Sequence, residues 1–142
     1  MGTTARFPAA GAAVVVANHP YGIVEGLILA AVLDRVRPDW TIMVNSMLAG
    51  VVPLLGRMIP VNPFDAPTAN AVNRAPLRES MRQLAADTAL VIFPAGEVAQ
   101  LDWTQRSIAD PPWKTTAARL AHAPGAALCR CSSRATTACS FR

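Results

Sequence analysis

The chain has 142 residues, of which 52% are hydrophobic, and this suits a single domain with a sizeable core. It lacks an uninterrupted run of about 18 apolar residues and a basic N-terminal region followed by a long apolar stretch, so it predicts neither a transmembrane helix nor a signal peptide. The formal net charge is +4, but residues 1–113 carry eight Arg and nine acidic residues, whereas residues 114–142 carry one Lys, four Arg and no acidic residue. The basic character therefore belongs to the C-terminal tail.

The first predicted element is a buried strand over residues 12–17, an apolar run that ends in a turn containing Pro and Gly. An apolar run of good helix formers follows at residues 27–33. Between them lies the segment NHPYGIVEG, residues 18–26, which places His19 after the strand and Glu25 in the first turn of the helix. The helix dipole favours a carboxylate in this position.

His19 and Glu25 are candidates for a general-base site. A neutral imidazole can take a proton near neutral pH, and a carboxylate on its other nitrogen fixes the tautomer and stabilises the imidazolium. Gly22 supplies the backbone freedom that brings the two side chains together. The alternative is that His19 only caps a turn and Glu25 only caps the helix.

Helix and strand patterns alternate through the next part of the chain. The predicted elements are a strand over residues 40–45, a short helix over residues 47–55 interrupted by Pro53, a strand within residues 56–64, an amphipathic helix over residues 75–86 and a strand over residues 90–93. Such alternation predicts an α/β fold, a mostly parallel sheet flanked by helices.

Three segments after His19 and Glu25 agree with them in order and spacing, and together they resemble the glycerolipid acyltransferase superfamily, the PlsC-like lysophospholipid acyltransferases. These segments are GRMIPVNPF at residues 56–64, LVIFPAGEV at residues 90–98, and Trp113-Lys114 with the helix that follows. Five residues separate His19 from Glu25, where the superfamily usually has four residues and Asp. This spacing, and a glutamate after the glycine in FPAGE, are similar to the branch of hemolysin-like proteins and ornithine-lipid acyltransferases.

The resemblance implies that His19 is the general base and that Glu25 orients it. Members that form phosphatidic acid end the second block in an Arg that holds the acceptor's phosphate, but this chain has Asn62-Pro63 there. Arg57 or Arg74 could take its place, or both could be solvated surface charges. Glu97 either orients the acceptor or is a solvated loop residue. The predicted substrate-binding set is Asn18, Gly22, Arg57, Asn62, Arg74, Phe93, Pro94, Gly96 and Glu97.

The tail beyond residue 128 shows neither a strand nor a helix pattern, and it holds all three cysteines. We therefore expect an acyltransferase domain over residues 1–128, incomplete at its C-terminus, and a disordered tail over residues 129–142. A frameshift explains the change, because an alternative reading frame from Leu128 permits the apolar segment that the branch carries here. The nucleotide sequence tests this hypothesis. Cys129-Arg130-Cys131 is a weak zinc or disulfide pattern without a second pair.

The resemblance implies transfer of a fatty acyl group from acyl-CoA or acyl carrier protein to a lipid acceptor, without another cofactor or a metal. Direct transfer is favoured over an acyl-enzyme because the sequence has no Gly-x-Ser-x-Gly motif. The expected place is the inner, cytoplasmic face of the membrane, and no nucleic acid is expected as a partner. The alternatives are an inactive, truncated remnant that at most binds acyl chains, and a hydrolase that uses His19 and Glu25 to activate water.

Overall fold

A computed structural model describes residues 7–50, 56–64, 69–104, 106–122, 125–132 and 138–141. Its centre is a six-stranded sheet in the order β3-β2-β4-β1-β7-β8. Five strands run parallel, and β8 pairs antiparallel with β7. The strands are β1 (Ala13–Ala17), β2 (Trp40–Asn45), β3 (Met58–Val61), β4 (Ala89–Ile92), β7 (Ala127–Ser132) and β8 (Ala138–Phe141). The predicted α/β fold with a mostly parallel sheet is confirmed.

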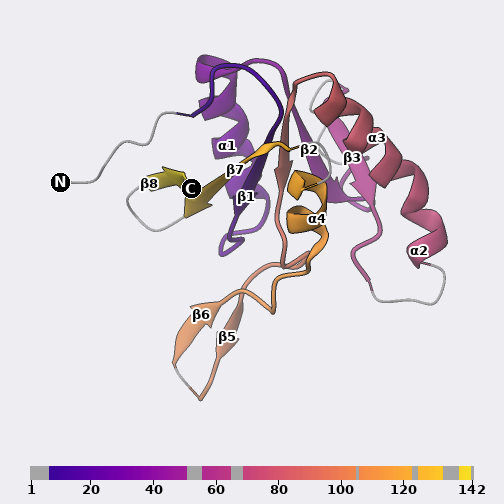
Figure 1. Cartoon of the computed structure of the whole chain (residues 1–142). Helices are drawn as coiled ribbons and strands as arrows, with labels where there is room; N and C mark the ends of the chain where they lie inside the picture. Colours follow the sequence, from indigo (N-terminus) through magenta and orange to yellow (C-terminus); the bar gives the residue numbers. More distant parts are fainter. Residues whose placement is uncertain are drawn as a thin grey trace.

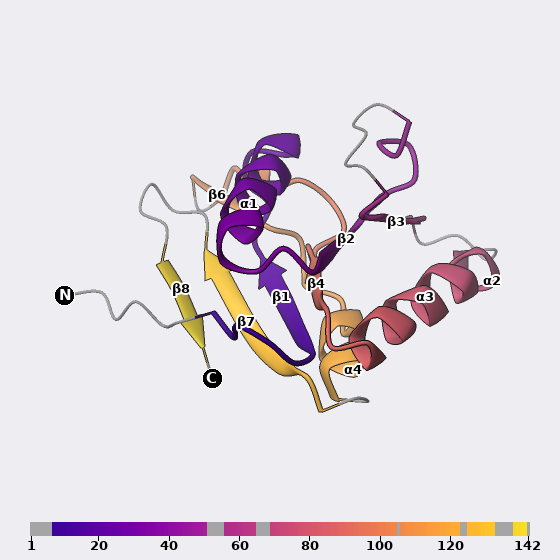
Figure 2. The same ribbon diagram turned by 90° about the horizontal axis from the view of Figure 1, so that it is seen from above.

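Helices cover both faces of the sheet. They are α1 (Ile23–Val36), α2 (Ala69–Val72), α3 (Arg74–Ala85) and α4 (Thr116–His122). Figure 2 shows α1 on one face, with α3 and α4 on the other. A separate antiparallel hairpin, β5 (Gln100–Asp102) and β6 (Ser107–Ala109), projects away from the body of the molecule (Figure 1). Within the described residues, no helix combines the length and the apolar character needed to cross a membrane.

The central strand β1 is buried along its whole length, because β4 and β7 flank it and helices cover both of its faces. Val15 belongs to a core cluster that includes Leu33 of α1. Val14 belongs to a second cluster that includes Leu84 of α3 and Leu120 of α4. Full burial of one such aliphatic side chain contributes about 1.5–3 kcal/mol. A continuous apolar run is thus what a strand buried on both faces requires.

The predicted strands at residues 12–17, 40–45, 56–64 and 90–93 are confirmed, and so is the amphipathic helix near residues 75–86, which is α3. The predicted helix at residues 47–55 is wrong for residues 47–50, which form turns. The Asn45 side chain accepts a hydrogen bond from the Met47 N–H at 3.0 Å, and the Asn45 carbonyl accepts one from the Leu48 N–H at 2.8 Å. These bonds favour a turn over a helix. Residues 51–55 lie outside the described residues.

The prediction of a disordered tail is wrong for residues 129–132 and 138–141, which lie in β7 and β8. β7 pairs along the whole of β1, with Cys129 opposite Val15, and it crosses the predicted boundary at residue 128. Cys129 and Cys131 are buried in the cluster beneath α1, while Arg130 between them is exposed. Buried cysteine acts as a small hydrophobic residue, so this alternation supports a strand. Residues 133–137 and 142 lie outside the described residues.

Arg37 follows α1 at the edge of the sheet where β1 begins, and its side chain is completely buried. Its guanidinium donates hydrogen bonds to the carbonyls of Pro8, Gly11 and Asp87. It also binds both carboxylate oxygens of Asp39, each at 3.0 Å. The bonds from Arg37 hold the pKa of Asp39 below its ordinary value. Arg37 therefore ties the segment before β1 to the loops before β2 and β4.

We predict that Arg37→Ala lowers the free energy of unfolding by about 3 kcal/mol, because it removes a fully buried guanidinium and leaves the carbonyls of Pro8, Gly11 and Asp87 without this donor. Urea denaturation followed by circular dichroism measures this. Arg35→Ala is the matched control, since Arg35 is exposed in the last turn of α1, and it should change stability by less than about 0.5 kcal/mol. Equal effects of the two substitutions contradict the role given to Arg37.

The lowered pKa of Asp39 predicts a pH-dependent contribution to stability. A carboxyl group with a lower pKa in the folded state stabilises the fold above its unfolded pKa of about 3.8, and this is lost as pH falls through the folded value. The stability difference between wild type and Asp39→Asn should therefore be largest near neutral pH and shrink as pH falls below 3.8. A difference that does not change with pH contradicts the prediction.

Candidate active site

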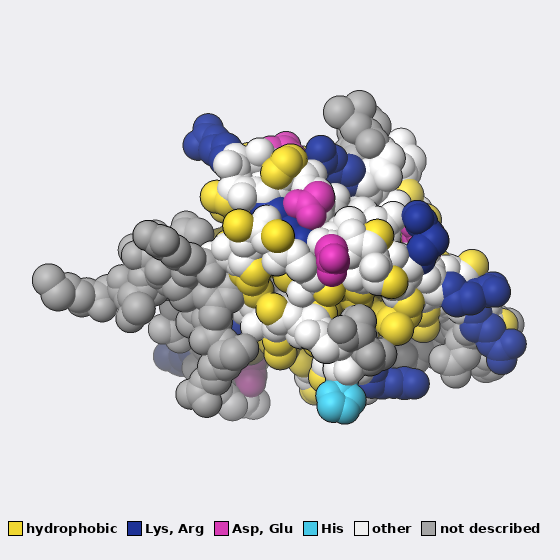
Figure 3. Space-filling view, turned by 45° about the horizontal axis from the view of Figure 1, so that its top comes forward, with side chains coloured by type: hydrophobic (Ala, Val, Ile, Leu, Met, Phe, Trp, Pro, Cys, Tyr) yellow, Lys and Arg dark blue, Asp and Glu magenta, His cyan; other side chains and the backbone are white. Residues whose placement is uncertain are grey.

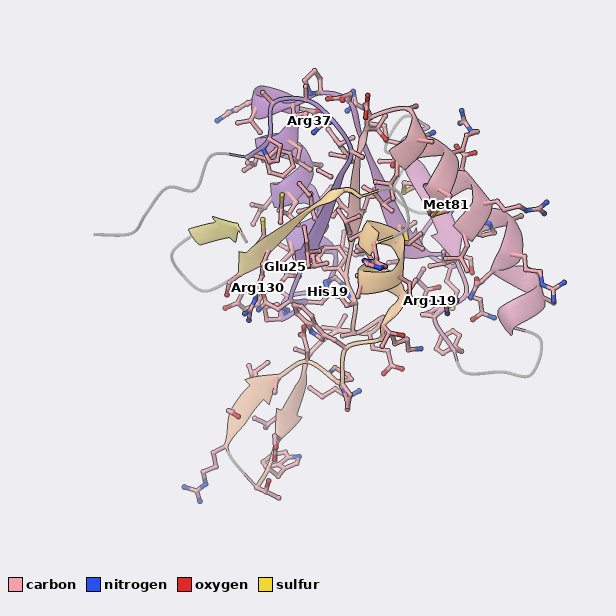
Figure 4. The ribbon with its side chains drawn as sticks, in the orientation of Figure 1. His19, Glu25, Arg37, Met81, Arg119 and Arg130 are labelled. Carbon is pink, nitrogen blue, oxygen red and sulfur yellow. The ribbon has the colours of Figure 1, made fainter. Side chains whose placement is uncertain are left out.

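A cavity of about 310 Å³ lies at the edge of the sheet where the parallel strands end. Its walls come from the loops after β1, β3 and β4, from the first turn of α1 and from α4. Figure 4 places His19, Glu25, Arg119 and Arg130 toward this edge and Arg37 at the opposite one. Ligands of open α/β sheets bind outside the carboxyl ends of the strands, so the cavity has the expected position for a substrate site.

His19 and Glu25 meet at this edge. The Nδ1 atom of His19 lies 3.1 Å from Oε2 of Glu25, and the second oxygen, Oε1, accepts a hydrogen bond from the Tyr21 N–H at 2.6 Å. Glu25 is 2% exposed and the His19 side chain 15%. An ionised carboxylate only accepts hydrogen bonds, so this contact places the proton of a neutral imidazole on Nδ1. Nε2 is then left as the basic atom.

The ring of His19 is also held from its sides. It stacks on Phe93, which follows β4, with ring centroids 4.2 Å apart and planes 28° from parallel. Gly22 precedes α1 with φ of 69°, a left-handed conformation that other residues rarely adopt, and this turn lets Glu25 reach back toward His19. The imidazole therefore has a defined orientation before any substrate binds.

The backbone of His19 is fixed by the segments on either side of the β5–β6 hairpin. The His19 N–H donates to Oδ1 of Asp110 at 3.0 Å, and the His19 carbonyl accepts a bond from the Ala99 N–H at 2.9 Å. Oδ2 of Asp110 accepts a bond from the indole N–H of Trp113 at 2.9 Å. Both polar groups of the His19 backbone are thus bonded to residues about 80 to 91 positions away.

Side-chain bonds shape the wall opposite His19. The side chain of Asn73 bonds the N–H and the carbonyl of Asn62, at 2.8 and 2.7 Å, and this joins the loop after β3 to the start of α3. Lys114 joins the loops after β3 and β4, because its Nζ donates to the Pro63 carbonyl at 2.8 Å and its N–H to the Pro94 carbonyl at 2.9 Å. These bonds hold the cavity wall in one shape.

The loop after β4 contributes shape to the cavity. Gly96 has φ of 74°, and its N–H donates to the Phe93 carbonyl at 3.0 Å, which closes a tight turn. This bond uses the Gly96 N–H within the turn. A Cβ atom on Gly96 would lie 3.7 Å from Pro63 and 3.9 Å from the Lys114 stem, so the glycine keeps this wall open.

The structure brings most of the predicted site residues to the cavity, which is lined by His19, Gly22, Asn62, Phe93, Pro94 and Gly96. Four of the predicted substrate-binding residues do not line it, and neither does the buried Glu25. Asn18 lies between β1 and His19, and Glu97 is exposed, with Gln100 3.5 Å from its Oε2. Arg74 is exposed on the first turn of α3, and Figure 3 shows basic side chains along this helix.

Arg57 also lies away from the cavity, at the amino end of β3. Its Nη1 bonds Oδ1 of Asp34 at 3.1 Å and the Pro38 carbonyl at 2.6 Å, and its guanidinium lies 4.8 Å from the centre of the Trp40 ring. The chain turns into β3 directly after Arg57, so the guanidinium remains at the edge of the sheet opposite His19. The structure therefore gives Arg57 structural partners and no access to a substrate in the cavity.

Sequence reasoning did not identify Asp110 or Arg119. Asp110 contacts a residue 91 positions away, which no local pattern reveals. Arg119 of α4 lines the cavity, and its side chain makes no hydrogen bond or ion pair within the part of the chain that the structure describes. The helical pattern of α4 could have indicated Arg119. The buried residues of this helix are Ala117, Leu120 and Ala121, so Arg119 lies on another face.

The described residues contain no group of three or more His, Cys, Asp or Glu side chains that could hold a metal ion.

The fold and the site define an α/β protein with a His–carboxylate pair at the carboxyl edge of a parallel sheet. The model of a protein family described as acyltransferase matches residues 2–130. The chain belongs to this acyltransferase family, and membership supports a general acyltransferase activity. No curated protein matches the chain.

Proposed function

We propose that this protein transfers a fatty acyl group from a thioester, acyl-CoA or acyl carrier protein, to a hydroxyl or amine of a lipid acceptor. The observation that carries this proposal is the contact between His19 and Glu25 at a cavity with apolar walls. A His–carboxylate pair activates an acceptor by removing its proton. The membership of an acyltransferase family supports the same reaction class.

His19 acts as the general base in this proposal. Nε2 takes the proton from the acceptor while the acceptor oxygen or nitrogen attacks the thioester carbonyl carbon. The tetrahedral intermediate then collapses, the carbon–sulfur bond breaks, and the imidazolium returns the proton to the leaving thiolate. Glu25 stabilises the imidazolium through Nδ1, because its carboxylate is 3.1 Å away and almost completely buried.

The cavity supports a lipid substrate through its lining. Ile42 and Met43 of β2, Met58 of β3 and Leu77 of α3 provide apolar surface, and Leu27 of α1 extends it toward the exterior. An acyl chain gains free energy in proportion to the apolar area that leaves water. Polar groups also line the cavity, among them His19, Asn62 and Lys114. In this proposal they orient the reacting end of the acyl chain.

The finer assignment is also part of this proposal. The order and spacing of the motifs support the PlsC-like superfamily and its hemolysin-like and ornithine-lipid branch. Because the proposed acceptor is a lipid, we expect the protein to bind peripherally to the inner face of the membrane. Arg119 supports an acceptor or donor with an anionic group, since it is a cation of the cavity wall and guanidinium binds phosphate and carboxylate in a two-pronged geometry.

We predict that the wild-type protein releases thiol from acyl-CoA only when a lysolipid acceptor is present. His19→Ala should lower kcat by about 10²–10⁴-fold, the usual contribution of a general base. His122→Ala is the matched control, because His122 is the other histidine of the chain and is exposed on α4. Release without an acceptor indicates a hydrolase. Full activity of His19→Ala, or no release under either condition, contradicts the proposal.

Glu25→Gln tests whether the Glu25 carboxylate orients and stabilises the imidazole of His19 or only fills space beside it. When the amide oxygen accepts the Tyr21 N–H, the NH₂ group lies beside Nδ1 in place of the charged Oε2. We expect kcat to fall by about 10²-fold with little change in KM, because the imidazolium loses its charged partner. Glu79→Gln, on the exposed side of α3, should leave both constants unchanged. A change in KM alone contradicts the orienting role.

Arg119→Gln tests the anionic group. We expect KM for an acceptor with a phosphate to rise by about tenfold or more, because a charge-assisted hydrogen bond is lost, while kcat stays nearly constant. KM for a monoacylglycerol, which has no phosphate, should not change if the acceptor carries the anion. Arg78→Gln on α3 is the control, since Arg78 is exposed and does not line the cavity. Unchanged KM for both acceptors and for acyl-CoA contradicts the assignment.

A further inference from the structure

The β5–β6 hairpin exposes apolar side chains beside the candidate active site. Leu101 and Ile108 are opposite each other in the strand register, so they share one face of the hairpin, and they are 46% and 62% exposed. Trp103 at the tip is 81% exposed. The hairpin projects from the edge of the sheet that holds the cavity (Figures 1 and 4). An isolated two-stranded hairpin is marginally stable in water, so these side chains favour a covering surface.

The same hairpin is fastened to the general-base candidate. Ala99 directly precedes β5 and donates its N–H to the His19 carbonyl at 2.9 Å. Asp110 directly follows β6 and accepts the His19 N–H at 3.0 Å. The residues that flank the two ends of the hairpin are therefore both hydrogen-bonded to the backbone of His19. Any force that fixes the hairpin also fixes the position of this residue.

The surface around the base of the hairpin continues its apolar character. A Cβ atom on Gly22 would lie 3.6 Å from Val98, so the segment before β5 lies against the start of α1. Ile23 and Leu27 of α1 line the cavity and are also 41% and 45% exposed. The cavity thus opens beside apolar surface on α1, next to the segment that leads into the hairpin.

The charges of this part of the chain favour an anionic surface. Residues 100–132, counted from the start of the hairpin, contain four basic residues, Arg106, Lys114, Arg119 and Arg130, and two acidic residues, Asp102 and Asp110. Oδ1 of Asp102 accepts hydrogen bonds from Thr104. Both carboxylate oxygens of Asp110 are already bonded. Basic residues close to an anionic membrane contribute about 1 kcal/mol each. Tryptophan and the long stems of basic residues suit the boundary between headgroups and acyl chains.

The small size of the hairpin favours a lipid surface over a protein. A stable protein interface buries about 800 Å² on each partner, whereas the hairpin offers three large apolar side chains. A membrane covers such a projecting tip without a complementary shape. A lipid surface also supplies the acceptor that the proposed reaction consumes.

We propose that the β5–β6 hairpin docks on an anionic lipid surface and that docking fixes His19 in its reactive position. The first part is a binding property that can be measured without any reaction. The second part rests on the proposed function, because it assigns the docking an effect on the general base. Asp110 is the positioning residue that connects the two.

Sedimentation with vesicles tests the docking. Wild type should bind vesicles of phosphatidylcholine and phosphatidylglycerol, and its tryptophan emission should shift to the blue. The double substitution Trp103→Ser and Ile108→Ser should weaken binding by about tenfold or more, because it removes two of the three apolar anchors. Trp103→Ser alone should abolish the emission shift, since Trp40 is buried and Trp113 is bonded to Asp110.

Val36→Ser is the matched control, because Val36 is 53% exposed and ends α1 at the opposite edge of the sheet. It should bind vesicles as wild type does. Unchanged vesicle binding by the double variant overturns the proposal. A change in oligomeric size on gel filtration, without vesicle binding by wild type, indicates that a second copy covers the hairpin and also overturns it.

Activity with a short-chain, water-soluble donor and acceptor tests the coupling to His19. Vesicles should raise the kcat of wild type, and Asp110→Ala should bind vesicles normally but lose this stimulation. Asp110→Asn should restore part of it, because the amide oxygen can still accept the His19 N–H. Full stimulation of Asp110→Ala overturns the coupling. If His19→Ala retains activity while vesicle binding still depends on Trp103, the proposed function fails and the docking stands.

Discussion

Parallel pairing of β1 with β4 and β7 is the constraint on which the site depends. All strands of a parallel set end at the same edge, so the loops that leave β1, β3 and β4 meet although the chain separates them by tens of residues. His19 reaches this edge because it follows β1 after Asn18, and the pairing of β1 with β4 and β7 places the end of β1 there. The central strand thus sets the position of the general-base candidate.

The two edges of the sheet use charge for different purposes. At the amino edge, Arg37 and Arg57 bind carboxylates and backbone carbonyls within the fold, so these two side chains join segments of the chain. At the carboxyl edge, Lys114 joins two loops, while the side chain of Arg119 faces the cavity without a bond to another described residue. A guanidinium at a cavity wall that bonds no described residue is suited to bind an incoming anion. The position of each arginine in the sheet therefore separates structural from binding roles better than its sequence context does.

The strands and the His19–Glu25 pair could be predicted because their signals are local. Apolar runs mark β1, β2 and β4, and the pair lies within one strand–helix connection. Asp110 could not be found in this way, since its contact with His19 spans 91 residues and depends on the packing of the hairpin. The strand β7 was missed for another reason. The sequence beyond Leu128 has no run of β-branched residues, and its strand pattern becomes visible only when Cys129 and Cys131 are counted as small hydrophobic residues that alternate with more exposed positions.

Glu25 shows why capping and catalysis need not be alternatives. It is the third residue of α1, where a glutamate side chain can reach back to the N–H groups before the helix, and Oε1 accepts the bond from Tyr21. Gly22 before the helix provides no side-chain cap, so this bond satisfies a donor at the helix start. Oε2 remains for His19. One buried carboxylate thus both caps the start of the helix and orients the imidazole. Its burial is tolerated because each of its oxygens has a donor, whereas a buried carboxylate without donors would cost several kcal/mol.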